Sequence, residues 1–169
     1  MSRIAAEARR AELEEVASPD AILAFLTITD VGLDEPIRVV SDVTDYQLDG
    51  ALFVGLPFGF RLVTDTEEIP RAQLTMQNVD RRIGQAILNL RGRPDLTLEL
   101  RSSADFDLSV VPRTPLGLAA PIYAFRRMTL RDVSVSATEL TGTVMLHDYS
   151  TEPWPSKRAI AQRLPGLFW

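Results

Sequence analysis

The stretch DLTLELR at residues 95–101 places leucine at every second position, between polar or charged residues. Successive side chains of a β-strand point to opposite faces of the sheet, so this alternation separates an apolar face from a polar one. The stretch therefore predicts a half-buried strand. The segment at 106–110 alternates Phe106, Leu108 and Val110 with polar residues and predicts a second strand.

Shorter apolar segments earlier in the chain also have the composition of strands, because they are rich in β-branched and aromatic residues and are bounded by turn residues. They lie at 21–29, 37–40, 52–54, 57–63 and 72–76. Later in the chain, a long β segment begins at Ile122, and residues 140–146 follow as its partner strand. Its apolar phase shifts near Arg131-Asp132, which predicts a bulge or a sharp bend.

Two segments have helical patterns. Residues 2–17 consist largely of Ala, Glu, Arg and Leu, contain no Gly or Pro, and predict an N-terminal helix. A second helix is predicted near Asp80–Arg91, where Asp80 suits the N-cap and Gly92 suits the position after the helix end. Apolar residues recur in it at spacings of three and four, so we expect one face to pack onto the sheet.

The last segment of the sequence, residues 151–169, differs from an ordinary disordered tail. Its final 16 residues contain two Trp and a Phe, whereas disordered tails are usually poor in aromatic residues. We expect this C-terminal arm to be extended and to be covered by a neighbouring subunit. The residues expected to form that subunit interface are Trp154, Leu164, Pro165, Leu167, Phe168 and Trp169.

Together these elements predict a mainly β protein, or a β-rich α+β protein. The expected fold is an antiparallel β-sandwich or barrel-like domain over residues 19–150. The N-terminal helix at 1–18 precedes this domain, and the C-terminal arm follows it.

Composition excludes several classes of function. The chain has 169 residues, 46% of them hydrophobic, and a formal charge of −5, which does not favour nucleic-acid binding. It has no cysteine, and therefore no disulfide or thiolate metal site. No apolar run approaches the roughly 20 residues that span a bilayer, and charges interrupt the N-terminus where a signal peptide would be apolar. We therefore expect no membrane span, and synthesis in the cytoplasm.

Candidate catalytic and metal-binding residues form no recognisable constellation. His147 precedes Asp148, but adjacent residues of a strand point to opposite faces, so the aspartate is badly placed to orient the imidazole. Carboxylates cluster at Asp42/Asp45/Asp49 and at Asp65/Glu67/Glu68 without the spacing of a calcium loop. We expect a protein that is not an enzyme and has no cofactor and no metal.

Four segments, taken in order along the chain, resemble a family of minor tail proteins of long-tailed bacteriophages and related particles. They are Pro36-Ile37-Arg38-Val39-Val40-Ser41-Asp42, Leu56-Pro57-Phe58, Asn78-Val79-Asp80-Arg81 and Pro165-Gly166-Leu167-Phe168. The resemblance implies a structural component of the tail tip, similar in role to the distal tail proteins that form a ring between the tail tube and the hub. It carries over no catalytic residue.

A ring in which each subunit contacts the next head to tail would bury one C-terminal arm per subunit. The resemblance therefore implies a homo-oligomer, with a hexamer as the first expectation, together with tube, hub and tape-measure proteins as partners and the virion tail as location. Two alternatives stay open: a trimeric hub subunit, and a carbohydrate-binding module used in host attachment.

Overall fold

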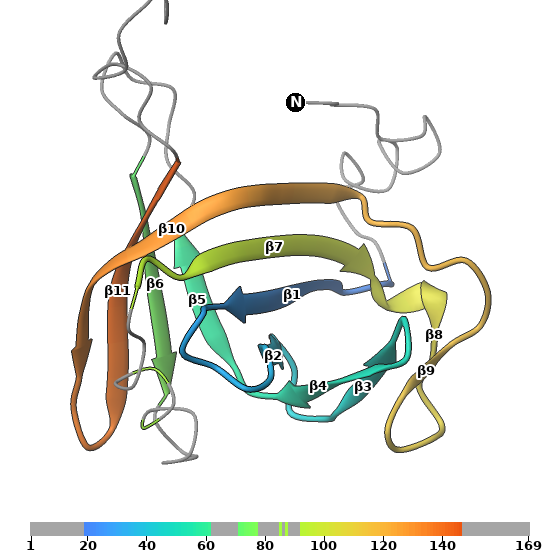
Figure 1. The fold of residues 1–169 in the computed structure, drawn as a ribbon. Helices are drawn as coiled ribbons and strands as arrows, with labels where there is room; N and C mark the ends of the chain where they lie inside the picture. The colour runs from blue at the N-terminus through green and yellow to red at the C-terminus, as the bar shows by residue number, and fades with distance from the viewer. Residues whose placement is uncertain (1–18, 62–70, 78–84, 86, 88–91, 147–169) are drawn as a thin grey trace, which may run out of the picture.

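A computed structural model describes residues 19–61, 71–77, 85, 87 and 92–146 (Figure 1). Strands dominate this part of the chain, and the prediction of a β-rich protein is confirmed. The strands are β1 (Ile22–Thr29), β2 (Ile37–Val40), β3 (Tyr46–Leu48), β4 (Ala51–Gly55), β5 (Phe58–Arg61), β6 (Arg71–Gln77), β7 (Asp95–Ser102), β8 (Phe106–Asp107), β9 (Thr114–Pro115), β10 (Tyr123–Val135) and β11 (Glu139–Leu146). A single 3-10 turn at Ser103–Asp105 follows β7 in this described part.

Nine of the described strands form one sheet in the order β3-β4-β2-β1-β7-β10-β11-β6-β5, and β8 pairs with β9 in a separate hairpin. The domain was predicted to be antiparallel, and this needs a correction: the sheet is mixed, because β2 and β4 are parallel. β3 and β4 are joined by Asp49-Gly50, both with positive φ (50° and 76°). Asp-Gly is the sequence that two-residue hairpin turns of this conformation favour.

The large sheet is rolled rather than flat. β4 and β5 are seven strand positions apart in the sheet order, which in a flat sheet would separate them by about 34 Å at the usual strand spacing. In the chain, however, only Leu56-Pro57 lies between them, a link that spans about 11 Å at most. The two ends of the sheet must therefore approach each other, and Figure 1 shows β5, β6 and β11 turned across the ends of β1 and β7.

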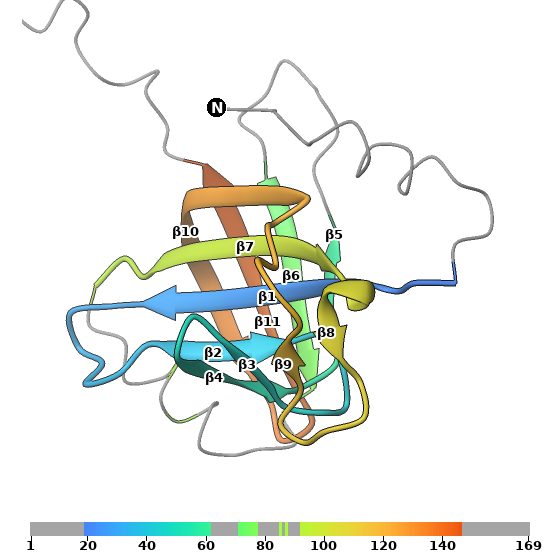
Figure 2. The same cartoon turned by 90° about the vertical axis from the view of Figure 1, so that its right-hand side faces the viewer.

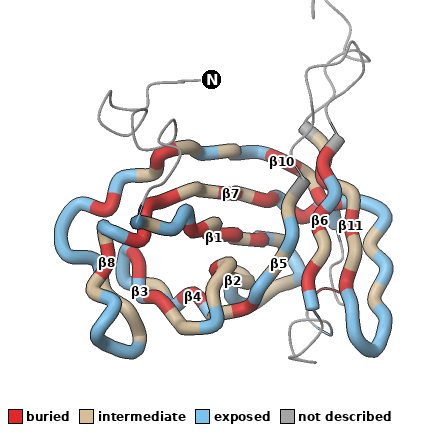
Figure 3. The backbone as a smooth tube through the Cα atoms, turned by 180° about the vertical axis from the view of Figure 1, so that it is seen from behind, coloured by how far each residue is buried: buried red, intermediate tan, exposed pale blue. Residues whose placement is uncertain are grey.

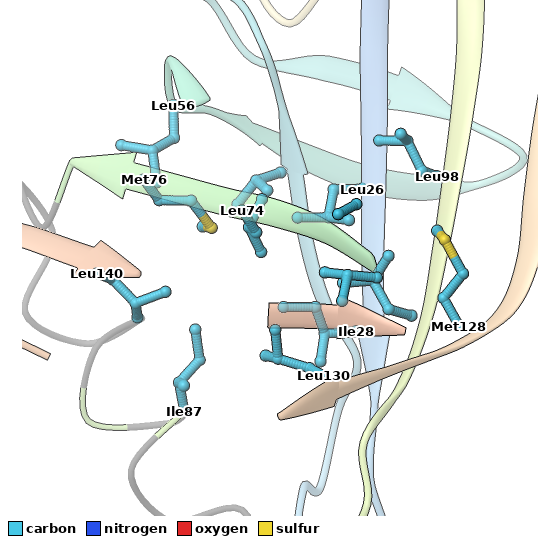
Figure 4. Packing of buried hydrophobic residues seen from close by; sticks show 14 residues of the cluster. Leu26, Ile28, Leu56, Leu74, Met76, Ile87, Leu98, Met128, Leu130 and Leu140 are labelled. Atoms are coloured by element: carbon cyan, nitrogen blue, oxygen red, sulfur yellow. The ribbon is translucent and has the colours of Figure 1, made fainter. Parts of the chain in front are cut away.

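The rolled sheet encloses the main hydrophobic core. Figure 4 shows apolar side chains from β1, β6, β7, β10 and β11 pointing towards one another. Among those fully buried are Leu26, Ile28, Leu74, Leu96 and Leu98. Figure 3 shows the same arrangement along the backbone, with buried positions repeating along the strands.

The strand DLTLELR is confirmed as β7, and its first two leucines, Leu96 and Leu98, are buried as the alternation predicts. The predicted bulge near Arg131-Asp132 is also confirmed, since the register between β10 and β11 shifts between Arg131 and Ser134. Asp132 has φ of 51° at that point.

The predicted strand at 106–110 is wrong beyond its second residue. β8 ends at Asp107, and both Leu108 and Val110 are exposed. The physical reason is a local turn in which the Asp107 carboxylate accepts hydrogen bonds from the backbone N–H of Ser109 (2.9 Å) and from its hydroxyl (2.6 Å). Such a turn ends a strand whatever the alternation beyond it.

Neither predicted helix is seen among the described elements. The N-terminal helix lies outside the described residues, as does the C-terminal arm. Within 80–91 only Gln85 and Ile87 are described; their backbone is helical, and Ile87 is buried in the main core. In the part of the chain that is described, no helix has the length and apolar character needed to cross a membrane.

Candidate functional site

An aromatic cluster lies beneath the β8–β9 hairpin. Phe106 of β8 stacks on Phe25 of β1 with ring centroids 5.5 Å apart, and it meets Tyr46 of β3 edge to face at 5.1 Å. Phe25 also meets Phe53 of β4 edge to face at 5.2 Å. Each such pair contributes about 0.5–1.5 kcal/mol beyond burial. The four rings therefore fix the start of the hairpin onto three strands of the large sheet.

Backbone hydrogen bonds fix the second half of the hairpin, at Arg113 just before β9, to β3. The N–H of Gln47 donates to the carbonyl of Arg113 at 2.8 Å, and the N–H of Arg113 donates to the carbonyl of Asp45 at 2.8 Å. Tyr46 and Arg113 thus form a short parallel bridge. Figure 2 shows β9 lying alongside β3 as a result.

Side chains reinforce this bridge in a group that we call the Arg113 clamp, consisting of Asp42, Tyr46 and Arg113. Arg113 Nη1 donates to Asp42 Oδ2 at 2.7 Å and to the Tyr46 hydroxyl at 2.6 Å, and that hydroxyl donates to Asp42 Oδ2 at 2.7 Å. The Arg113 guanidinium carbon lies 5.3 Å from the Tyr46 ring centroid, within cation–π range. The clamp thus ties the loop before β3 to the hairpin.

The protonation states in the clamp suit holding rather than reacting. Burial, followed by the hydrogen bond to Asp42, raises the pKa of Tyr46 to about 12, so the phenol stays protonated and keeps donating. The hydrogen bond with Tyr46 raises the pKa of Arg113, which therefore stays charged. A tyrosine that served as a base or nucleophile near neutral pH would need its pKa lowered. We therefore interpret the clamp as a structural device.

A second contact fixes the loop at 41–45 from the side of β4. The N–H of Gly55 donates to Asp45 Oδ1 at 2.8 Å. The backbone approaches so closely here that a Cβ on Gly55 would lie 2.7 Å from backbone atoms of Thr44. Together with the clamp, this contact positions the loop and the hairpin against the same end of the sheet.

Exposed apolar residues are concentrated in the β8–β9 hairpin and in the residues that follow it. Five residues within 108–118 expose their side chains, with Leu118 at 95% and Val111 at 77% exposure. We call them the hairpin patch: Leu108, Val110, Val111, Leu116 and Leu118. Several exposed large apolar residues within one short segment are the usual mark of a site of interaction with another macromolecule. The hairpin patch is therefore the candidate functional site.

The residues predicted to form the subunit interface all lie outside the described residues. Trp154, Leu164, Pro165, Leu167, Phe168 and Trp169 lie outside the described residues, as do His147 and the Asp65/Glu67/Glu68 group. Asp42 and Asp45 are described, but they are engaged by Arg113, Tyr46 and the Gly55 amide. Over the described ranges, no group of three or more His, Asp or Glu side chains is placed to hold a metal ion.

The hairpin patch and the clamp were both missed by sequence reasoning. A signal for the patch was available, because Val110-Val111 and Leu116-Gly117-Leu118 put apolar residues in a segment rich in proline and glycine. Such a segment is a loop, and apolar residues in a loop are exposed unless something covers them. The clamp had no comparable signal, since Arg113 follows Tyr46 by 67 residues.

These features define a β-rich domain with a rolled sheet that holds an apolar hairpin rigidly at one end. The chain belongs to DUF1833, a family described as a domain of unknown function, whose model matches residues 8–159. No protein of curated function matches the chain.

Proposed function

We propose that this protein is a structural subunit of a bacteriophage tail, placed in the tail-tip ring that joins the tube to the hub. The observation that carries the proposal is the hairpin patch, because a rigid apolar surface is what an assembly contact needs. Preorganised groups lose little conformational entropy when a partner covers them, so more of the burial free energy is available for association. We choose a phage tail as the assembly because the four sequence segments resemble minor tail proteins.

Two of those four segments occupy positions that build the fold. Pro36–Asp42 contains β2 and ends at Asp42 of the Arg113 clamp, and Leu56-Pro57-Phe58 forms the corner between β4 and β5. Leu56 is buried there, and its N–H donates to the carbonyl of Val40 at 3.0 Å. The residues that carry the resemblance thus help to build the fold, as expected if the family consists of structural subunits.

The corner between β4 and β5 also bears on whether the sheet is a barrel or a sandwich. We infer a partly closed, barrel-like sheet rather than two separate sheets, since one short link joins its two ends. The C-terminal arm and the hairpin patch give such a domain two distinct contact regions. Two different regions allow a head-to-tail contact, which forms a ring when the rotation between successive copies closes; the trimeric hub subunit is the alternative within this class.

A reconstruction of purified tails tests the proposal directly. We expect this chain at the tail tip in a ring, with six copies as the first expectation and three if it is a hub subunit. Particles that contain no copy of the chain contradict the proposal. Capture of the isolated protein on host glycans, combined with its absence from a ring, would instead favour the carbohydrate-binding module.

A further inference from the structure

We infer that the hairpin patch is the docking site for the C-terminal arm, residues 151–169, of a neighbouring copy of this chain. The inference rests on the proposed function and gives it a specific contact. It assigns an occupant to the exposed residues of the hairpin, and it assigns a surface to the aromatic residues of the arm.

The placement of the two regions favours a neighbouring copy. The arm follows β11, which ends at Leu146, and Figures 1 and 2 both show this end of β11 on the opposite side of the domain from the β8–β9 hairpin. A chain segment that leaves one end while its binding surface lies at the other is suited to a head-to-tail contact. Each copy could then offer its hairpin patch to the arm of one neighbour and its own arm to the patch of the next.

The length of the segment is sufficient for this contact. Residues 147–169 follow β11, and 23 extended residues reach about 75 Å. A folded domain of this size is roughly 40 Å across, from its expected radius of gyration. The arm is therefore long enough to cross to an adjacent subunit. It is also long enough to reach the hairpin patch of its own domain. The experiment below separates these two routes.

Charge complementarity supports the same pairing. The segment that carries the hairpin patch, 103–118, and the segment bonded to it, 41–50, contain five aspartates and one arginine: Asp42, Asp45, Asp49, Asp105, Asp107 and Arg113. The arm contains three basic residues and one acidic residue: Lys157, Arg158, Arg163 and Glu152. Opposite potentials steer association and favour the correct partner. An apolar arm with positive charges therefore fits an apolar patch in an acidic surround.

Cysteine cross-linking tests the docking, because the natural chain has no cysteine. Full-length Leu118→Cys and Phe168→Cys proteins are purified separately, mixed and oxidised over a series of concentrations. We expect a disulfide-linked heterodimer at least about tenfold more abundant than in a mixture of Ser134→Cys with Phe168→Cys. Ser134 is the matched control, since it is exposed on β10 and pairs with Thr141 of β11, outside the β8–β9 hairpin.

Two outcomes overturn the inference. Cross-linking no greater than in the control mixture means that the arm does not dock on the patch. A double variant, Leu118→Cys with Phe168→Cys, that forms only a monomeric disulfide at a rate independent of concentration means that each arm folds back on its own domain.

The result is also separable from the proposed function. If cross-linking fails but Val111→Asp and Leu118→Asp still prevent incorporation into tails, the docking is wrong and the tail role stands. If the heterodimer forms but particles contain no copy of the chain, the docking stands and the tail role is wrong.

Discussion

Arg113 Nη1 lies 2.6 Å from the hydroxyl oxygen of Tyr46, a residue 67 positions earlier in the chain. This contact, with the backbone bridge between the same two residues, closes the hairpin onto the sheet. The apolar surface that we assign to assembly is therefore held by a polar contact at its base. Five predictions follow from this arrangement and from the packing around it, beginning with Arg113 itself.

Arg113→Ala is expected to loosen the hairpin. The substitution leaves the Tyr46 hydroxyl and Asp42 without their charged partner, and losing a partner of a buried polar group costs about 1–3 kcal/mol in the free energy of unfolding. Hydrogen exchange should rise at 106–118, and urea denaturation should show the loss. Arg126→Ala is the matched control, because Arg126 is exposed and reaches Glu99 only at 3.4 Å; equal effects of the two substitutions would contradict the clamp.

Tyr46→Phe tests the pH dependence of the clamp. The pKa of Tyr46 is raised from 10.0 to about 12, mainly by burial, so its stabilising effect is full below pH 10 and is lost as pH rises through 12. The variant should be less stable than the natural protein by about 1–3 kcal/mol below pH 10, because the hydroxyl's hydrogen bonds to Asp42 and Arg113 are both lost. That difference should shrink between pH 10 and 12 in urea denaturation, and a constant difference would count against the assigned role.

Gly55→Ala is expected to be destabilising by about 1–3 kcal/mol, because the new Cβ would lie 2.7 Å from the Thr44 backbone. Gly117→Ala is the control, since a Cβ there meets nothing within 4 Å. Thermal unfolding compares the two. Equal melting temperatures would show that the loop at 41–45 is not packed against β4 as described.

Composition and bounding turn residues, together with the alternation of apolar and polar residues at 95–101, were sufficient to predict most of the described strands. The alternation failed where local polar chemistry intervened. Leu96 and Leu98 are buried as predicted, because one face of β7 lies on the core. Leu108 and Val110 have the same spacing, but Leu108 lies within the turn made by Asp107 and Ser109 and Val110 follows it, so both reach solvent. Alternation describes the faces of a strand and does not show where the strand ends.

The candidate site was predictable only in part. Apolar residues in a loop rich in proline and glycine indicate an exposed surface, and this rule could have identified Val111 and Leu118 from the sequence. The clamp depends on a contact between segments far apart in the chain, which neither spacing nor composition encodes. The parallel pairing of β2 with β4 is hidden for the same reason.

Leu26→Ala and Ile22→Ala separate the core from the surface of one strand. Leu26 is fully buried in the main core, whereas Ile22 on the same strand is 49% exposed. We expect Leu26→Ala to cost about 2–5 kcal/mol in the free energy of unfolding. Ile22→Ala should cost less than about 1 kcal/mol, since an exposed side chain leaves no cavity. Urea denaturation gives both values, and a reversed order would contradict the packing.

Val111→Asp and Leu118→Asp test the role of the hairpin patch. Both side chains are exposed, so each substitution should change the free energy of unfolding by less than about 0.5 kcal/mol. An added carboxylate would still have to be desolvated in any contact that covers the patch, which disfavours assembly. Ser134→Asp, at an exposed position on β10, is the control for added charge.

The most direct measurement is the amount of each variant in purified tails, determined by quantitative mass spectrometry against a tail-tube protein. We predict that Val111→Asp and Leu118→Asp fall to less than about a tenth of the natural copy number, the level expected for a loss near 1.4 kcal/mol in assembly. Ser134→Asp should remain at the natural level. Natural amounts of both hairpin variants in intact tails would contradict the assignment of the hairpin patch as an assembly surface.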